Sequence, residues 1–184
     1  MSTPGSGSDG GTQELVTVRL VGFPLAVHLR AVQQSDAMRR EFQLIVLQER
    51  EHAGSVPARL LSLSTVLASR YEGFSEQQEQ LIEDSSSAGR TQLDELVFVL
   101  PRDVSEAAQQ LGDILDEADA FCRSGHLLTL ATPPDLVTYR RWYLDNFIAQ
   151  CEGGPPQPWT DTRLAGPAEQ EPAAPSSAGP GDTG

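Results

Sequence analysis

Two amphipathic stretches decide the fold of this chain: DVSEAAQQLGDILDEADAFC at residues 103–122 and PDLVTYRRWYLDNFIAQC at residues 134–151. In the first stretch, apolar residues recur at steps of three and four positions, and acidic residues stand between them. This spacing predicts a helix with one buried stripe and one acidic face. Asp103 and Glu106 have the spacing of a capping box, which would start the helix.

The second stretch predicts a helix that supplies much of the aromatic core. Five aromatic side chains lie between Phe121 and Phe147. Thr132 and Asp135 flank two prolines with the spacing of another capping box, which places a proline in the first helical turn. Because the burial of one large apolar side chain contributes ~1.5–3 kcal/mol, we expect the core to lie between these two helices.

Short apolar runs outside these helices predict a small sheet. Residues 15–21 alternate between apolar and polar, which predicts a strand with one buried face. Residues 95–101 are apolar at most positions, which predicts a strand buried on both faces in the centre of a sheet. Residues 127–131 would form a third strand, and a crossover from 96 to 131 would make that pair of strands parallel.

Helical spacing of apolar residues recurs in residues 25–50 and 57–73, and a short exposed helix is expected at 76–84. The predicted fold is therefore α+β and helix-dominated, with four to five helices packed on a small three-stranded sheet. An all-α bundle, in which the apolar runs are buried loops, is the alternative.

Composition divides the chain into three parts. Residues 1–14 are rich in Gly, Ser and Thr, and residues 152–184 are rich in Pro, Gly, Ala and Glu. Such segments bury too little apolar surface to offset the entropy lost on ordering them. We therefore predict disordered tails at 1–14 and 152–184, and a single globular domain at 15–151.

The chain is strongly acidic, with a net charge of −13 and no lysine. An acidic surface repels phosphate groups, so binding to nucleic acid and to anionic membranes is disfavoured. No run approaches the ~20 apolar residues that span a bilayer, and the N-terminus lacks the pattern of a signal peptide. Each of the two cysteines lies on an apolar helical stripe, which predicts buried free thiols and a cytoplasmic location.

The sequence carries no recognisable catalytic or cofactor motif. No Gly-rich loop carries a lysine, and no G-x-S-x-G occurs. The histidines and cysteines are not spaced as metal ligands, so no catalytic residue, cofactor or metal is predicted. His28 is interpreted as a structural residue. The alternative is an enzyme or a small-ligand-binding module with a pocket near His28, His126 and Tyr139.

A cluster of arginine and aromatic residues in the second helix is the candidate interface. Arg140, Arg141, Trp142 and Tyr143 are of residue types that are common at interface hot spots. In the alternative interpretation, the aromatic residues belong to the core and both arginines point outward. Trp159 lies among prolines beyond the helix, and it either folds back onto the domain as a clamp or docks a partner as a polyproline II segment.

Five segments give the chain a resemblance to a known group of proteins: VTVRL at 16–20, VPARLL at 56–61, DEADAFC at 116–122, HLLTLATPP at 126–134 and RRWYL at 140–144. With these segments it resembles small actinobacterial proteins that accompany the anti-sigma kinase and antagonist modules of partner-switching stress signalling. The resemblance spans most of residues 15–159 and implies regulation by protein contact in the cytosol. It supplies no catalytic residue, and the chain lacks the Asn- and Gly-rich ATP-binding boxes of such a kinase.

The predicted function is that of a non-enzymatic cytosolic regulatory protein, which acts by protein–protein contact in partner-switching stress or sigma-factor signalling. The predicted partner is an anti-sigma or antagonist regulator, with no nucleic acid and no membrane. A flat, apolar-rimmed surface would favour this function. A defined cleft that gathers His28, His126 and Tyr139, with shifted pKa values, would favour the ligand-binding or enzymatic alternative.

Overall fold

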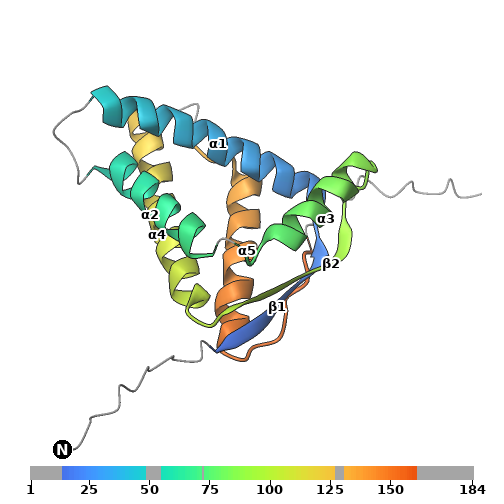
Figure 1. The fold of residues 1–184 in the computed structure, drawn as a ribbon. Helices are drawn as coiled ribbons and strands as arrows, with labels where there is room; N and C mark the ends of the chain where they lie inside the picture. The colour runs from blue at the N-terminus through green and yellow to red at the C-terminus, as the bar shows by residue number, and fades with distance from the viewer. Residues whose placement is uncertain (1–13, 49–54, 72, 127–130, 161–184) are drawn as a thin grey trace, which may run out of the picture.

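The computed structural model describes residues 14–48, 55–71, 73–126 and 131–160 as five α-helices and a two-stranded antiparallel sheet (Figure 1). The predicted helix-dominated α+β class is confirmed, and the all-α alternative is wrong. The elements in chain order are β1 (Leu15–Phe23), α1 (Leu25–Gln48), α2 (Val56–Arg70), α3 (Glu76–Ser87), β2 (Leu93–Pro101), α4 (Val104–Phe121) and α5 (Pro134–Cys151). A short π-helical turn, Cys122–His126, continues α4.

The long helix α1 runs along one side of the molecule, and α4 and α5 descend from it toward the sheet (Figure 1). Helix α2 packs against α1 and α4, helix α3 lies beside β2, and α5 supports β1. The two amphipathic stretches that the sequence analysis starts from, α4 and α5, pack against each other.

Three groups of buried side chains hold these elements together: a small one around Tyr139, between α1 and α5, and two larger ones. The largest lies between the sheet and α5, where the ring centroids of Phe98 and Phe147 are 5.4 Å apart. The second lies among α1, α2 and α4, where Phe42 is fully buried and meets Phe121 edge to face. The predicted core between α4 and α5 is thus only part of the whole, because α1 and the sheet also contribute buried faces.

The alternation predicted for residues 15–21 is confirmed. Val18 and Leu20 are fully buried, whereas Thr17 and Arg19 are exposed. β1 pairs antiparallel with β2 in a register that sets Val18 opposite Phe98. The buried side chains of both strands therefore share one face, which packs on α5.

β2 is not the central strand that its composition predicts. In the described part of the chain β1 is its only strand neighbour, and only one of its faces is covered. Phe98 points into the core, whereas Val97 and Val99 are 37% and 48% exposed. On the outer edge of β2 the side chain of Gln78, from α3, donates a hydrogen bond to the carbonyl oxygen of Val97.

Some predicted segments fall outside the described residues. These are the third strand at 127–131, apart from Ala131, together with the parallel crossover built on it, the tail at 1–14 apart from Glu14, and the chain from 161 onward. These predictions remain untested.

The predicted start of the C-terminal tail at residue 152 is too early. Residues 152–160, here called the C-terminal strap, turn back from the end of α5 and run along β1 (Figure 1). The backbone N–H of Trp159 donates to the carbonyl oxygen of Val21 at 3.0 Å. These residues are rich in proline and glycine, which disfavour helices, so their composition predicts a disordered tail. A segment can nevertheless be held on the surface of a domain without forming a helix.

The predicted capping boxes are wrong. Asp103 precedes α4, but its carboxylate accepts hydrogen bonds from Arg70 and from the hydroxyl of Tyr71 instead of capping the helix. Helix α5 begins at Pro134, after a second proline, and has no side-chain cap. A side chain near a helix end bonds to whatever donor the tertiary structure brings to it, so spacing alone does not decide its partner.

Two other predictions concern the cysteines and the membrane. Cys122 and Cys151 are both buried and free, as predicted. Among the described helices, none is long and apolar enough to cross a bilayer.

Candidate functional site

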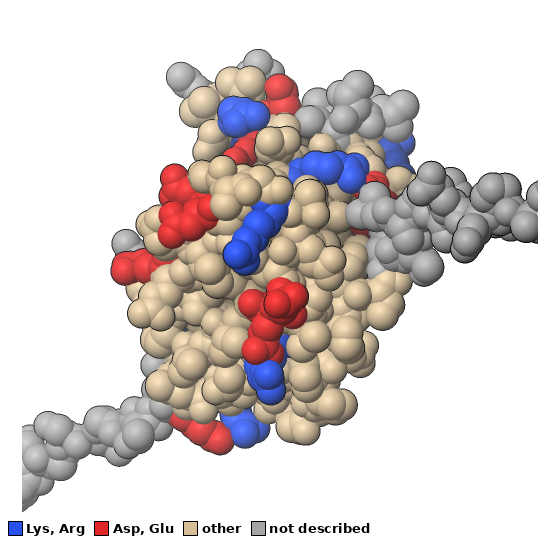
Figure 2. All heavy atoms as spheres, turned by 90° about the vertical axis from the view of Figure 1, so that its right-hand side faces the viewer, with Lys and Arg blue, Asp and Glu red and all other residues tan. Residues whose placement is uncertain are grey.

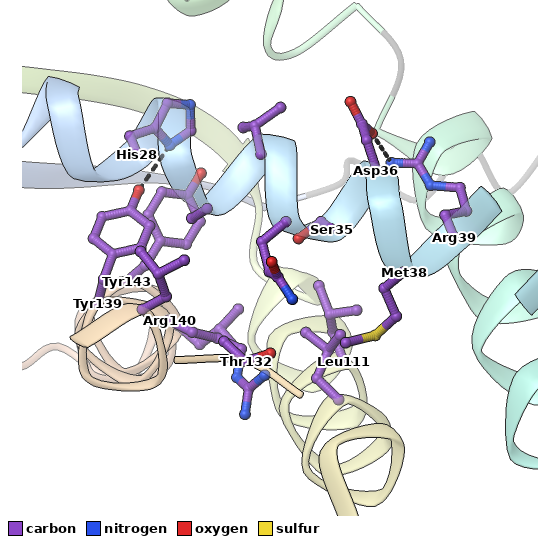
Figure 3. A pocket seen from close by; sticks show the side chains of 16 residues that line it. His28, Ser35, Asp36, Met38, Arg39, Leu111, Thr132, Tyr139, Arg140 and Tyr143 are labelled. Carbon is purple, nitrogen blue, oxygen red and sulfur yellow. Dashed lines mark hydrogen bonds and ion pairs between the residues drawn. The ribbon is translucent and has the colours of Figure 1, made fainter. Parts of the chain in front are cut away.

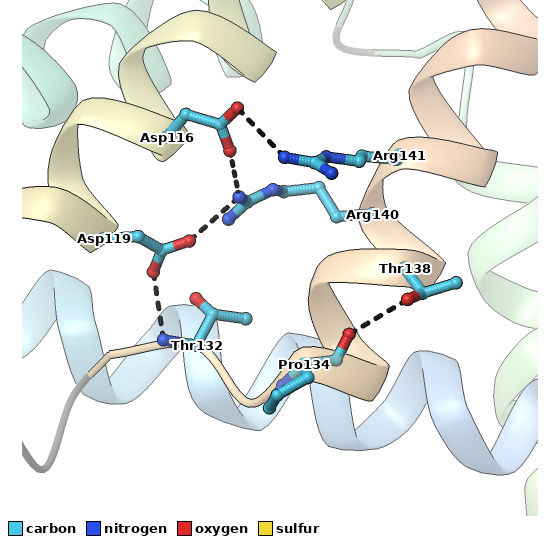
Figure 4. A network of polar contacts seen from close by, with 7 residues as sticks. All are labelled: Asp116, Asp119, Thr132, Pro134, Thr138, Arg140 and Arg141. Atoms are coloured by element: carbon cyan, nitrogen blue, oxygen red, sulfur yellow. Dashed lines mark hydrogen bonds and ion pairs between the residues drawn. The ribbon is translucent and has the colours of Figure 1, made fainter.

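The two neighbouring arginines of α5 have different surroundings (Figure 4). The side chain of Arg140 is 12% exposed and lies 2.9 Å from the carboxylate of Asp119, which is 2% exposed. Arg140 also meets Asp116 at 2.5 Å, whereas the side chain of Arg141 is 66% exposed and lies 3.7 Å from Asp116. The alternative in which both arginines point outward is therefore wrong for Arg140.

The buried ion pair joins three parts of the chain. Arg140 belongs to α5 and Asp119 to α4, and the second carboxylate oxygen of Asp119 accepts a hydrogen bond from the backbone N–H of Thr132 at 3.0 Å (Figure 4). Adjacent residues on a helix point about 100° apart, so Arg140 reaches the buried carboxylate of Asp119, whereas Arg141 lies at the surface near the exposed carboxylate of Asp116. Arg140 is thus a structural tie, and Arg141 is the arginine left for contact with another molecule.

The aromatic members of the predicted interface pack on one another and on the C-terminal strap. The ring of Trp159 lies 5.2 Å from that of Trp142 and 5.8 Å from that of Tyr139, centroid to centroid. The indole N–H of Trp142 donates to the carbonyl oxygen of Gln157 at 2.8 Å. The ring centroid of Tyr143 lies 5.9 Å from that of Tyr139 and 5.0 Å from that of Phe147. Of the two roles predicted for Trp159, the structure has the clamp.

Two buried amides, neither of them predicted from the sequence, tie the strap and β1 to α5. Asn146 accepts a hydrogen bond from the backbone N–H of Gln157 at 2.9 Å and donates one to its carbonyl oxygen at 3.2 Å. Gln150 accepts from the backbone N–H of Arg19 at 2.9 Å and donates to its carbonyl oxygen at 3.0 Å. The side chain of Gln150 thereby replaces a strand at the outer edge of β1.

A signal for these amides was present in the sequence. Trp142, Asn146 and Gln150 follow one another at steps of four residues, so they share one face of α5. A polar residue on an otherwise apolar stripe needs a buried hydrogen-bonding partner. Which backbone groups supply that partner depends on distant segments, and the local pattern carries no information on them.

A cavity of about 270 Å³, here called the α1–α5 pocket, lies between α1, α4 and α5 (Figure 3). Its wall contains His28, whose Nδ1 is 2.7 Å from the hydroxyl oxygen of Tyr139. Burial lowers the pKa of His28 to about 4 and raises the pKa of Tyr139. Two of the three residues predicted to share a pocket are therefore together, and the side chain of His126 lies outside the described residues.

The His28–Tyr139 pair in the wall of the pocket carries no charge at neutral pH. At pH 7 both His28 and Tyr139 are neutral, and their hydrogen bond satisfies one ring nitrogen of the histidine, as predicted for a structural residue. A histidine that is neutral with so low a pKa is a weak base. Within the described residues, no group of three or more His, Cys, Asp or Glu side chains could hold a metal ion.

Protonation of His28 should weaken the fold. Its pKa of about 4 in the folded chain lies below the ordinary 6.5, so the unfolded chain binds the proton more readily. The stability that comes from neutral His28 is complete above pH 6.5 and is lost as the pH falls toward 4. Between pH 7 and 5 we expect a loss of about 2 kcal/mol in the free energy of unfolding. Urea unfolding of the wild type and His28→Gln at both pH values measures it, and equal losses in the two proteins would contradict the assignment.

The face of the sheet that points away from α5 is a second candidate site, here called the outer sheet surface. It consists of the side chains that point away from α5: Leu15, Thr17, Arg19, Val21, Glu95, Val97 and Val99. Leu15 is 53% exposed, and Arg19 pairs with Glu95 across the strands. The side of the molecule on which α3 and β2 lie is largely uncharged, and acidic and basic side chains touch at some places on it, whereas one group of acidic side chains stands apart (Figure 2).

The predicted interface residues therefore do not form one exposed surface. Arg140 is tied to α4, Trp142 and Trp159 contact each other, Tyr143 packs inward, and Arg141 is open to solvent. The chain matches no protein-family model, no curated protein and no solved structure, so the assignment of a function rests on these contacts.

Proposed function

We propose that this chain is a non-enzymatic regulatory protein that acts by protein–protein contact, with the outer sheet surface as its interface. The observation that carries the proposal is the sequence of β2, which is apolar on both faces although the described chain covers only one of them. Continuous apolar runs are typical of strands with two covered faces. A partner protein supplies the second cover.

The exposure of these side chains supports this location. Antiparallel sheets with one free face normally place polar residues on it. Here Leu15, Val97 and Val99 stand on the free face in a chain with a net charge of −13. Grouped apolar side chains on a surface mark sites of interaction. The Arg19–Glu95 pair between the two strands offers polar contacts that would orient a partner.

The edges of the sheet favour contact through its face. At the edge of β1, Gln150 holds the backbone of Arg19, and Trp159 holds the carbonyl oxygen of Val21. At the edge of β2, Gln78 holds the carbonyl oxygen of Val97. A partner that added a strand would have to displace these bonds, whereas a partner that packs on the face displaces only water.

The resemblance to small actinobacterial proteins of partner-switching modules supplies the class of partner. We propose that the partner is an anti-sigma or antagonist regulator, and that the contact takes place in the cytoplasm. Such a role needs no cofactor, and it agrees with an acidic chain that disfavours nucleic acid.

A charge on the outer sheet surface should abolish this contact. Val99→Glu places a carboxylate in the apolar centre of the proposed interface, and we expect the affinity for the partner to fall at least about tenfold. Val66→Glu, on α2, is the matched control because Val66 is 56% exposed and lies outside the surface. The full chain, its two variants and Arg141→Ala are used as bait in cytosol from stressed cells, and binding is then measured with the purified regulator.

The outcomes separate the proposal from its alternatives. Recovery of an anti-sigma or antagonist regulator by the wild type and Val66→Glu, but not by Val99→Glu, supports it. If Arg141→Ala is the only variant that fails to recover the regulator, the interface lies on α5 and not on the outer sheet surface. If no such regulator is captured under several stresses, the proposed function is rejected.

A further inference from the structure

We infer that the α1–α5 pocket binds a small uncharged aromatic molecule that carries one hydroxyl or N–H group. This inference concerns a different part of the molecule from the outer sheet surface and does not depend on the proposed function. It rests on the size of the pocket, the apolar character of its wall, the internal pairing of its charges, and the His28–Tyr139 hydrogen bond.

The size of the pocket limits the ligand to one or two rings. Its volume is about 270 Å³. A cavity of about 150 Å³ holds benzene, and pockets for drug-sized molecules begin near 300 Å³. A fused two-ring molecule is therefore close to the upper limit.

Most of the wall is apolar and comes from three helices. Met38 and Ala31 contribute from α1, Leu111 from α4, and Leu136 and Leu144 from α5 (Figure 3). Methionine adapts its shape to an irregular neighbour, and its sulfur makes favourable contacts with aromatic rings. A ligand that buries a ring against these side chains gains from the removal of apolar surface from water.

The charged groups around the pocket have partners within the protein. The guanidinium of Arg140 is bound to Asp116 and Asp119, and Arg39 pairs with Asp36 at 2.8 Å at the mouth (Figure 3). An anionic ligand would compete with these carboxylates for the arginines and would bring a further negative charge near them. An uncharged ligand avoids both this competition and this repulsion.

The His28–Tyr139 pair supplies the polar contact. One proton, from either the Tyr139 hydroxyl or Nδ1 of His28, lies in the 2.7 Å hydrogen bond between these two groups. In either tautomer the pair retains a second proton and a second lone pair. It can therefore donate to or accept from a hydroxyl or N–H group at the edge of the ligand.

The test uses the full chain and three probes that share the same two fused rings: 2-naphthol, naphthalene and 2-naphthoate. Their affinities are measured by equilibrium dialysis. We expect saturable binding of one 2-naphthol, about fivefold weaker binding of naphthalene, which lacks the hydrogen bond, and at least about tenfold weaker binding of the anion. Equal affinity for all three probes, or no saturable binding of 2-naphthol, would overturn the inference.

Two pairs of variants locate the site. Tyr139→Phe should lower the affinity for 2-naphthol about fivefold and leave that for naphthalene unchanged, whereas Tyr71→Phe, which loses a hydroxyl bound to Asp103, should change neither. Ala31→Phe fills the pocket and should abolish both affinities, whereas Ala68→Phe, on the exposed side of α2, should not. Circular dichroism checks that each variant is folded. Undiminished binding to folded Tyr139→Phe and folded Ala31→Phe would reject the pocket as the site.

Discussion

Arg140→Met is expected to lower the free energy of unfolding by about 3–5 kcal/mol, because it leaves the buried carboxylate of Asp119 without its cation. Methionine keeps most of the apolar stem of the arginine and removes its guanidinium, so the loss reports mainly the unpaired carboxylate. Urea unfolding at pH 7, followed by circular dichroism, measures the shift in midpoint.

The neighbouring arginine provides the matched control for this experiment. Arg141→Met removes a cation that is mostly exposed and 3.7 Å from Asp116, so we expect a change of about 0–1 kcal/mol. The double variant Arg140→Met/Asp119→Asn should recover part of the loss, because it removes the unpaired charge and keeps an oxygen for the N–H of Thr132. Similar losses at Arg140 and Arg141, or no recovery in the double variant, would show that the pair does not tie α4 to α5.

Removal of the C-terminal strap is expected to have the second large effect. A chain that ends at Cys151 should lose about 3 kcal/mol of unfolding free energy relative to a chain that ends at Thr160. It loses the bonds from Trp159 to Val21, from Trp142 to Gln157 and from Gln157 to Asn146, each of which contributes about 0.5–1.5 kcal/mol. It also exposes apolar surface that the Trp159 ring covers.

The shortened chain provides its own spectroscopic readout. Trp142 becomes its only tryptophan, because the full sequence has two. Its emission should shift to longer wavelength as the ring becomes exposed to water, while the chain that ends at Thr160 should match the full protein. If both chains unfold at the same urea concentration, the strap does not contribute to stability.

The outcome at β2 shows why a strong local pattern can mislead about its surroundings. The alternation in β1 predicts its buried face correctly because the two faces of a strand differ in polarity. β2 lacks that contrast, since Val97 and Val99 are as apolar as the residues between them. The pattern of β2 therefore indicates that both faces of the strand are suited to an apolar environment. It does not indicate whether the same chain covers both faces.

The candidate site was predicted in part. The cluster at Arg140–Tyr143 lies on α5, and Trp159 lies beside it, but the five residues do not share one exposed surface. His28 and Tyr139 line one pocket although they are far apart in the sequence. Asn146 and Gln150 were missed because an amide reveals its role only through the backbone groups that it meets.

The sequence by itself determined the helices, the two strands, the buried face of β1 and the buried state of both cysteines. Each depends on the spacing of apolar residues within one element, and that spacing is local information. The tertiary structure alone decided that Arg140 faces Asp119 while Arg141 faces water, that the strap packs along β1, and that β2 keeps an open apolar face. Each of these depends on a contact between segments distant in the chain, where a rotation of one residue or the presence of one neighbouring strand changes the partner.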